Sequence, residues 1–153
     1  MMIPKNLRYQ EAVRHIITGA PFIQYLGMEL KELEPGICET IIPIERHHLQ
    51  QDNFIHAGVL ATMADHTAGM ASLSLAPEHH VVLTIEFKVN FLRPATGELL
   101  RCKAKVLKYG KTIIVTESEV FMANSGEEKL VAKATVTLAN VNQNSLANGA
   151  MME

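Results

Sequence analysis

The segment at residues 57–75 constrains the fold more than any other part of this sequence. Its residues are apolar almost all round, which is typical of a helix buried on every side rather than one lying on a surface. Pro77 is expected to end it. At 153 residues, of which 48% are hydrophobic, the chain has enough apolar matter for one core around such a helix and too little length for two typical domains.

The flanking sequence predicts the elements that enclose this helix. Asn6 is expected to cap a first helix that runs to His15, and a hairpin is expected around the turn at Pro35 and Gly36. A short apolar turn is predicted at residues 22–26, and a polar loop is predicted at residues 47–55. Four further β-rich runs follow the central helix, at residues 84–93, 99–109, 112–122 and 129–139.

The first of these runs alternates strictly between apolar and polar residues. It therefore predicts a strand with one buried face, formed by Ile85, Phe87, Val89 and Phe91. The fold class that follows is α+β, with an antiparallel β-sheet wrapped around one long central helix. Such a sheet covers one side of the helix only, so we expect a second copy of the chain to cover the other side and the sheet edges.

The domain boundaries and the cellular setting follow from the rest of the sequence. We expect a single domain over residues 1–141, with residues 1–21 as an N-terminal helix and lead-in and residues 142–153 as a flexible tail. The two cysteines lie in strand-like stretches and no secretory signal follows the start, so a cytoplasmic protein with reduced thiols is expected. The net charge of −2 supplies no basic field for nucleic acid or for an anionic membrane surface. The expected partner is therefore a small molecule or another copy of the chain.

Asp65 stands in the middle of the predicted buried helix. A buried carboxylate needs a partner, which here is either a backbone group or a lysine, or a ligand in a functional site. The helix start offers one kind of partner, because Ala57 and Gly58 leave backbone N–H groups open to an approaching oxygen. Asp65 lies eight residues after Ala57, roughly 12 Å along the axis and turned by about 80°. The two groups reach one reacting carbon only if they come from two helices related by a two-fold axis.

Three stretches together resemble a known family. They are "QQDNFIHAGVLATMAD" at 50–65, "LTIEFKVNFLRPA" at 83–95 and "VLKYGKTI" at 106–113, and they resemble the hotdog-fold acyl-CoA thioesterases of the phenylacetate-pathway (PaaI-like) type. The resemblance covers roughly residues 22–141. It implies hydrolysis of acyl-CoA thioesters to free acid and coenzyme A by a homodimer or a dimer of dimers. It implies no metal and no cofactor beyond the coenzyme A of the substrate.

The resemblance also implies roles for single residues. The backbone N–H of Ala57 matches the oxyanion donor, and Asp65 of the neighbouring subunit matches the nucleophile or general base. His56 matches the histidine at the helix start, which is expected to be structural and to line the site. Gln50 stands where an asparagine is common and is expected to orient water or the thioester. Thr84 matches a supporting hydroxyl at the start of the following strand.

Two positions depart from the family pattern. The common His-Gly-Gly reads His56-Ala57-Gly58 here, and Asn53 replaces a common glycine. Neither change removes a backbone N–H, and asparagine tolerates a left-handed turn better than other non-glycine residues. We expect Gly58 and Asn53 to influence how closely a bulky acyl group approaches.

Other features leave alternatives open. Arg93, Lys108 and Lys111 lie at predicted strand ends, where they bind coenzyme A phosphates or form an ordinary solvated rim. Phe22, Tyr25 and Leu26 either wall an acyl pocket or belong to the core. Seven histidines show no metal-ligand spacing. A non-catalytic acyl-CoA binding protein and a hotdog-fold hydroxyacyl dehydratase are the alternative functions.

Overall fold

The computed structural model describes residues 2–147. Its elements are α1 (Tyr9–Gly19), α2 (Pro21–Tyr25), β1 (Glu29–Glu34), β2 (Ile37–Pro43), the 3₁₀ turn η1 (Arg46–His48), α3 (Ala57–Leu73), β3 (His80–Phe91), β4 (Leu99–Tyr109), β5 (Ile113–Asn124), β6 (Glu127–Asn142) and α4 (Gln143–Ala147).

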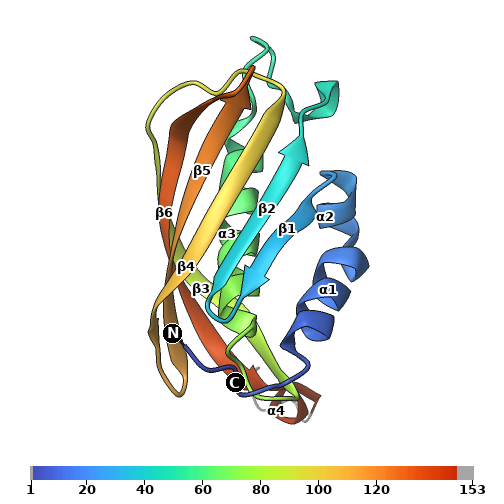
Figure 1. The fold of residues 1–153 in the computed structure, drawn as a ribbon, viewed down its shortest axis with the longest axis vertical. Helices are drawn as coiled ribbons and strands as arrows, with labels where there is room; N and C mark the ends of the chain where they lie inside the picture. Colours follow the sequence, from blue (N-terminus) through green and yellow to red (C-terminus); the bar gives the residue numbers. More distant parts are fainter. Residues whose placement is uncertain (1, 148–153) are drawn as a thin grey trace.

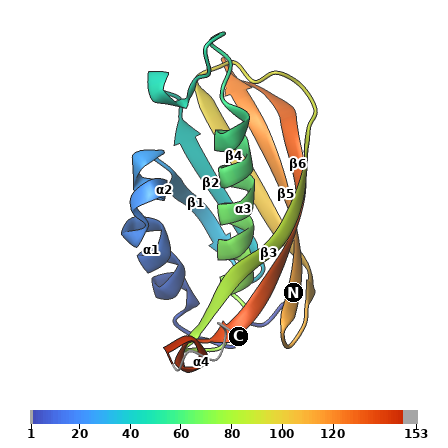
Figure 2. The same cartoon turned by 180° about the vertical axis from the view of Figure 1, so that it is seen from behind.

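The strands form one antiparallel sheet in the order β1-β2-β4-β5-β6-β3. The sheet curves around α3, which packs against strands β2 to β6 (Figure 1). From behind, α3 lies in the hollow of the sheet, with α1 and α2 at the β1 side (Figure 2). The predicted α+β fold, an antiparallel sheet wrapped around one long central helix, is therefore confirmed.

Buried hydroxyl groups help to position α3 on the sheet. The Thr67 hydroxyl lies 2.7 Å from the Thr40 hydroxyl of β2, and the Ser72 hydroxyl lies 2.8 Å from the Thr116 hydroxyl of β5. Ser118 of β5 donates a hydrogen bond of 2.8 Å to the Ala64 carbonyl. Because a buried polar group without a partner is costly, these bonds favour one rotation of the helix about its axis. That rotation directs Thr67 toward the sheet and Asp65 toward the open side.

The prediction that α3 is buried on every side is wrong for the single chain. Ala57 and Gly58 are exposed, and a stripe that continues through Ala61, Asp65 and Gly69 is only partly covered. The apolar composition of the helix is real, but the chain's own sheet covers only the face that it contacts. An apolar sequence pattern alone does not distinguish a helix face that the chain's own sheet covers from one that it leaves open.

The predicted buried face of the strand at 84–93 is also wrong for the single chain. This strand is β3, which begins four residues earlier than predicted and forms a free edge of the sheet. Ile85, Phe87 and Phe91 keep 56%, 42% and 47% of their surface exposed, and only Val89 is partly buried. A β-bulge between Thr84 and Glu86 also interrupts the strict alternation. Alternation of apolar and polar residues along a strand indicates that one face is apolar. It does not indicate whether the same chain or another molecule covers that face.

The ends of several elements differ from the prediction. The prediction that Asn6 caps the first helix is wrong, because α1 begins at Tyr9 after Arg8 and has no side-chain cap, and it continues to Gly19. Asn6 instead accepts a hydrogen bond of 2.8 Å from the Arg8 N–H before the helix starts. Helix α3 ends at Leu73. The expected flexible tail from residue 142 is instead regular at first, since β6 runs to residue 142 and α4 follows over Gln143–Ala147. The remainder of that predicted tail, 148–153, lies outside the described residues. No helix within residues 2–147 is both long and apolar enough to cross a membrane.

Candidate active site

A tight loop fixes the start of α3. Leu49 and Ile55 pair across it, and the Gln50 N–H donates to the Phe54 carbonyl at 2.8 Å. Asn53 has a φ of 65°, the left-handed conformation that the sequence led us to expect for it. The Gln50 side-chain oxygen accepts from the Asp52 N–H, so this oxygen closes the loop, and the amide nitrogen is the group left for a ligand.

The buried side chain of His48 holds this loop in place through hydrogen bonds, and sequence reasoning missed this role. Its ring is buried, receives the Glu45 N–H on Nδ1 at 2.9 Å, and therefore donates from Nε2 to the Leu26 carbonyl at 3.0 Å. Burial, with the neighbouring His47 ring, lowers the pKa of His48. Its carbonyl accepts the His56 N–H at 2.8 Å, so His48 supports the residue that caps α3.

His56 is the N-cap of α3. Its Nδ1 accepts the Gly58 N–H at 2.9 Å, and its carbonyl accepts the Val59 N–H at 2.9 Å. A side chain at Gly58 would place its Cβ 2.9 Å from that Nδ1, so the cap requires glycine here. Among the described residues no acceptor faces the remaining first-turn N–H, that of Ala57, which is exposed. This N–H is available for an oxygen that approaches from outside the chain.

Asp65 lies on the open stripe of α3 and is half-buried. The Thr84 hydroxyl, from β3, donates a hydrogen bond of 2.7 Å to its Oδ1. This bond joins the helix to the free edge strand and orients the carboxylate. Within the described residues of the single chain, the hydrogen-bond partner of Asp65 is this Thr84 hydroxyl, and neither a backbone group nor a lysine of the same chain takes that place. Asp65 and Ala57 of one chain lie on the same helix and are roughly 12 Å apart along its axis.

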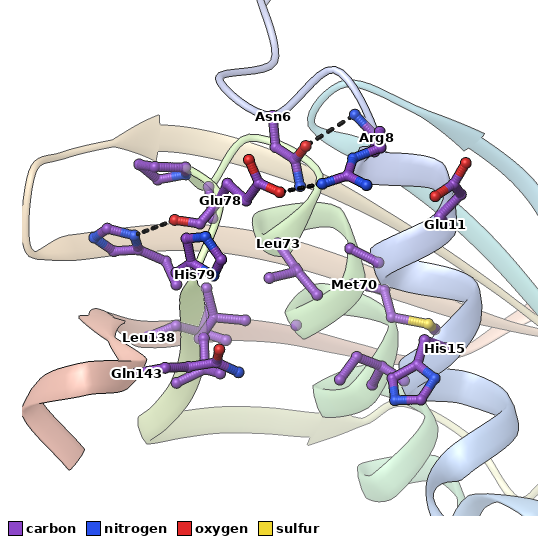
Figure 3. Close-up of a pocket in the computed structure, with 18 of the residues that line it drawn as sticks. Asn6, Arg8, Glu11, His15, Met70, Leu73, Glu78, His79, Leu138 and Gln143 are labelled. Atoms are coloured by element: carbon purple, nitrogen blue, oxygen red, sulfur yellow. Dashed lines mark hydrogen bonds and ion pairs between the residues drawn. The ribbon is translucent and has the colours of Figure 1, made fainter. Parts of the chain in front are cut away.

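A pocket of about 380 Å³ begins at Asp65 and Thr84. It lies between α1, the second half of α3 and the beginning of β3 (Figure 3). The expected wall residues Phe22 and Tyr25 do not line it and are 59% and 65% exposed. Sequence reasoning missed this pocket, because the packing of α1 against α3 leaves no pattern in the sequence.

His66 also lines this pocket. Its Nε2 is buried and has no hydrogen-bond partner within the described residues. Burial lowers the pKa of His66, although the adjacent Asp65 carboxylate acts in the opposite direction. The His66 ring therefore forms part of the pocket wall.

The three basic residues predicted at strand ends do not gather in one chain. Arg93 donates to the Leu130 carbonyl at 2.7 Å, near the start of β6. The Lys111 carbonyl accepts from the Asn140 side chain, near the end of β6, and Lys108 pairs with Val115 close to the same end. Ten residues of strand separate these two places, which is about 30 Å. Two ends of the sheet therefore carry these charges. Among residues 2–147, no group of three His, Cys, Asp or Glu side chains gathers as a metal site would require.

Comparison with known proteins agrees with this architecture. The model of the thioesterase superfamily matches residues 52–129, about half of the chain. A crystal structure of a thioesterase family protein from Silicibacter pomeroyi is 39% identical, with a TM-score of 0.86, over 88% of this chain and 98% of that one. Human acyl-coenzyme A thioesterase 13 is 30% identical over 84% of this chain and 91% of its own. The medium/long-chain acyl-CoA thioesterase YigI of Escherichia coli K12 is 25% identical over 76% and 83%. The chain therefore belongs to the thioesterase superfamily, as a hotdog-fold member of it.

Proposed function

We propose that this protein hydrolyses acyl-CoA thioesters to a free acid and coenzyme A. The observation that carries the proposal is the Asp65 carboxylate, which the Thr84 hydroxyl orients in the wall of a pocket next to apolar side chains of α1 and α3. Two of the relatives described above are named acyl-CoA thioesterases, which supports coenzyme A esters as the substrate class.

The reaction needs a group that stabilises negative charge on the thioester oxygen. The Ala57 N–H suits this role, because it points out of the start of α3 and no acceptor within the described residues uses it. Since Asp65 lies roughly 12 Å farther along the same helix, the Ala57 N–H that serves it has to come from a second copy. In one route Asp65 attacks the carbonyl carbon and displaces the coenzyme A thiolate, and water then hydrolyses the resulting mixed anhydride to the free acid and Asp65. In the other route Asp65 takes a proton from the water that attacks the carbonyl carbon, and the leaving thiolate receives a proton in turn.

The residues around these two groups have supporting roles in this proposal. His56 and Gly58 hold the first turn so that the Ala57 N–H points outward. Asn53 shapes the loop that precedes it, and the Gln50 amide nitrogen orients the water or the thioester. These roles follow from position and need no metal ion.

A dimer completes each site in this proposal. The edge strand β3 exposes apolar side chains, and the open stripe of α3 lies beside it, joined to it by the bond between Asp65 and Thr84. Two copies that pair antiparallel at β3 cover both surfaces and bring the start of one α3 toward the middle of the other. The opposite ends of the two sheets then also approach each other. Arg93 of one copy and Lys108 and Lys111 of the other are the candidates for the coenzyme A phosphates.

Release of free coenzyme A, measured with a thiol reagent, tests the proposal. The protein's own thiols stay silent in this assay because Cys38 and Cys102 are buried, and burial raises the pKa of Cys102 to about 12 and that of Cys38 even further. We expect Asp65→Asn to lose at least 99% of the rate, whereas Glu32→Gln, on exposed β1, keeps it. Binding of acyl-CoA without turnover by the unmodified protein would instead favour a binding protein.

A further inference from the structure

The walls of the pocket behind Asp65 change character along its length. Asp65 and Thr84 form one end. Between the two ends, four elements contribute apolar wall residues, namely Ala12, Ile16, Gly69, Met70, Leu73, Val82 and Leu138, and the polar residues Glu11, His15 and His66 line the same pocket. No Phe or Tyr side chain takes part in the described lining. The far end is polar again, where Arg8 and Glu78 form an ion pair (Figure 3).

Gly69 is the residue that leaves the middle of the pocket open. It follows Asp65 by four residues, so it lies on the same face of α3, about 6 Å farther along the axis. A Cβ at this position would meet only the Leu138 Cδ2, at 3.9 Å, which is an ordinary contact. The backbone therefore does not require glycine here, and glycine inside a helix is less stable than alanine. The absence of a side chain at Gly69 leaves space in the pocket, which is a physical reason for glycine at this position.

The Arg8 and Glu78 pair lies at the far end of the pocket, where 67% and 48% of the two side chains are exposed to solvent. Arg8 precedes α1 and Glu78 lies in the turn after α3, so the pair ties together two elements that flank the pocket. Charged groups are a poor environment for the methyl end of a hydrocarbon chain, because they would lose water without gaining a partner. A chain that enters at Asp65 is therefore expected to stop before this pair.

We propose that the pocket binds an unbranched aliphatic acyl chain of about eight to ten carbons, admitted by Gly69 and limited by Arg8 and Glu78. The length follows from α3, since the eight residues from Asp65 to Leu73 rise about 12 Å. An extended chain advances about 1.2 Å per single bond, so about ten bonds fill this distance. A phenylacetyl group would leave much of the pocket empty. This inference rests on the proposed thioesterase function and adds the substrate class.

A panel of acyl-CoA esters tests this inference on the purified full-length protein. The panel contains butyryl, octanoyl, decanoyl, hexadecanoyl and phenylacetyl esters, and the readout is kcat/KM from thiol release. We expect the unmodified protein to prefer octanoyl-CoA and decanoyl-CoA. In Gly69→Leu, the ratio of kcat/KM for decanoyl-CoA to that for butyryl-CoA should fall at least tenfold, and in Gly69→Ala it should fall less.

Two further variants separate filling of the pocket from damage to α3. Ala12→Leu fills the same space from α1 and should lower the same ratio. Gly19→Leu is the matched control, because a Cβ at the end of α1 meets nothing within 4 Å, and its ratio should match that of the unmodified protein. Circular dichroism and gel filtration check that each variant is folded.

Removal of the charged side chains at the far end of the pocket should increase the preference for longer acyl chains. Arg8→Ala and Glu78→Ala should each move the preferred chain length upward by two or more carbons. The inference is overturned if the variants Gly69→Leu and Ala12→Leu leave the chain-length profile unchanged, or if phenylacetyl-CoA is the best substrate. An absence of turnover with every ester, by contrast, would overturn the proposed function itself.

Discussion

The shared site makes a quantitative prediction for two variants that are mixed. Asp65→Asn removes the carboxylate, and Ala57→Pro removes the proposed oxyanion donor. Proline is compatible with the fold at this position, since Ala57 is the first residue of α3 and His56 before it has φ −61° and ψ 134°, an extended conformation. The Ala57 N–H donates to no group within the described residues, so proline costs the folded chain no hydrogen bond.

Each variant alone should be almost inactive. Loss of one oxyanion donor costs about 10²- to 10³-fold in kcat, and loss of general-base help costs about 10²- to 10⁴-fold. Both variants should therefore show less than about 1% of the wild-type rate. When the two are unfolded together and refolded in equal amounts, each site draws its Ala57 and its Asp65 from different chains. About a quarter of the sites then carry both intact groups, so the rate should rise to about a quarter of the wild-type value.

Thiol release from octanoyl-CoA measures this recovery, with each variant refolded alone as a control. A second control mixes wild type with the double variant. A shared site predicts about a quarter of the wild-type rate in that mixture, whereas a site within one chain predicts about half. If the two single variants show no recovery when mixed and gel filtration shows that they have exchanged subunits, the reasoning is refuted.

Three further outcomes are expected. Thr84→Val should lower kcat about 10- to 100-fold with little change in thermal stability, because it removes the hydrogen bond that orients Asp65; an unchanged kcat would contradict that role. Phe87→Glu should place a charge on the apolar edge strand and halve the apparent mass in gel filtration, with loss of activity, whereas a stable monomer that keeps full activity would contradict a shared site. The free energy of unfolding should fall as the pH decreases below about 6.5, since burial lowers the pKa of His66 below this ordinary value and the unfolded chain takes up the proton first. Urea unfolding at pH 7 and pH 5 should show a smaller decrease for His66→Leu than for wild type, and an equal decrease would rule out His66 as a source.

Patterns of neighbouring residues in the sequence were sufficient to predict most of the fold. The apolar run that became α3, the alternating β-rich runs and the turns between them are signals of neighbouring residues, and they were sufficient to predict a sheet around one helix. The resemblance to the thioesterases, rather than a local pattern, placed His56 at the helix start and Asn53 where a glycine is common, and the structure has His56 as the N-cap and Asn53 at a positive φ. Boundaries were less accurate, since strand ends depend on the partner strand, as in β6, which extends to pair with the beginning of β3.

The candidate site was predictable only in part, because its groups come from distant positions. The resemblance indicated Asp65 and Thr84, and the structure shows that they are bonded. The separation of Arg93 from Lys111 along β6 depends on strand register, which three isolated basic residues do not reveal. The pocket depends on how α1 packs on α3, and the ion pair at its far end joins residues 70 positions apart.

The sequence by itself determined the elements, the central helix and the placing of a carboxylate within it, because hydrophobic period and turn chemistry are properties of short stretches. Only the tertiary structure decided which apolar faces the chain covers itself and which it leaves open. Both kinds of face look the same in a sequence, since the gain from burying apolar surface does not depend on which molecule provides the cover.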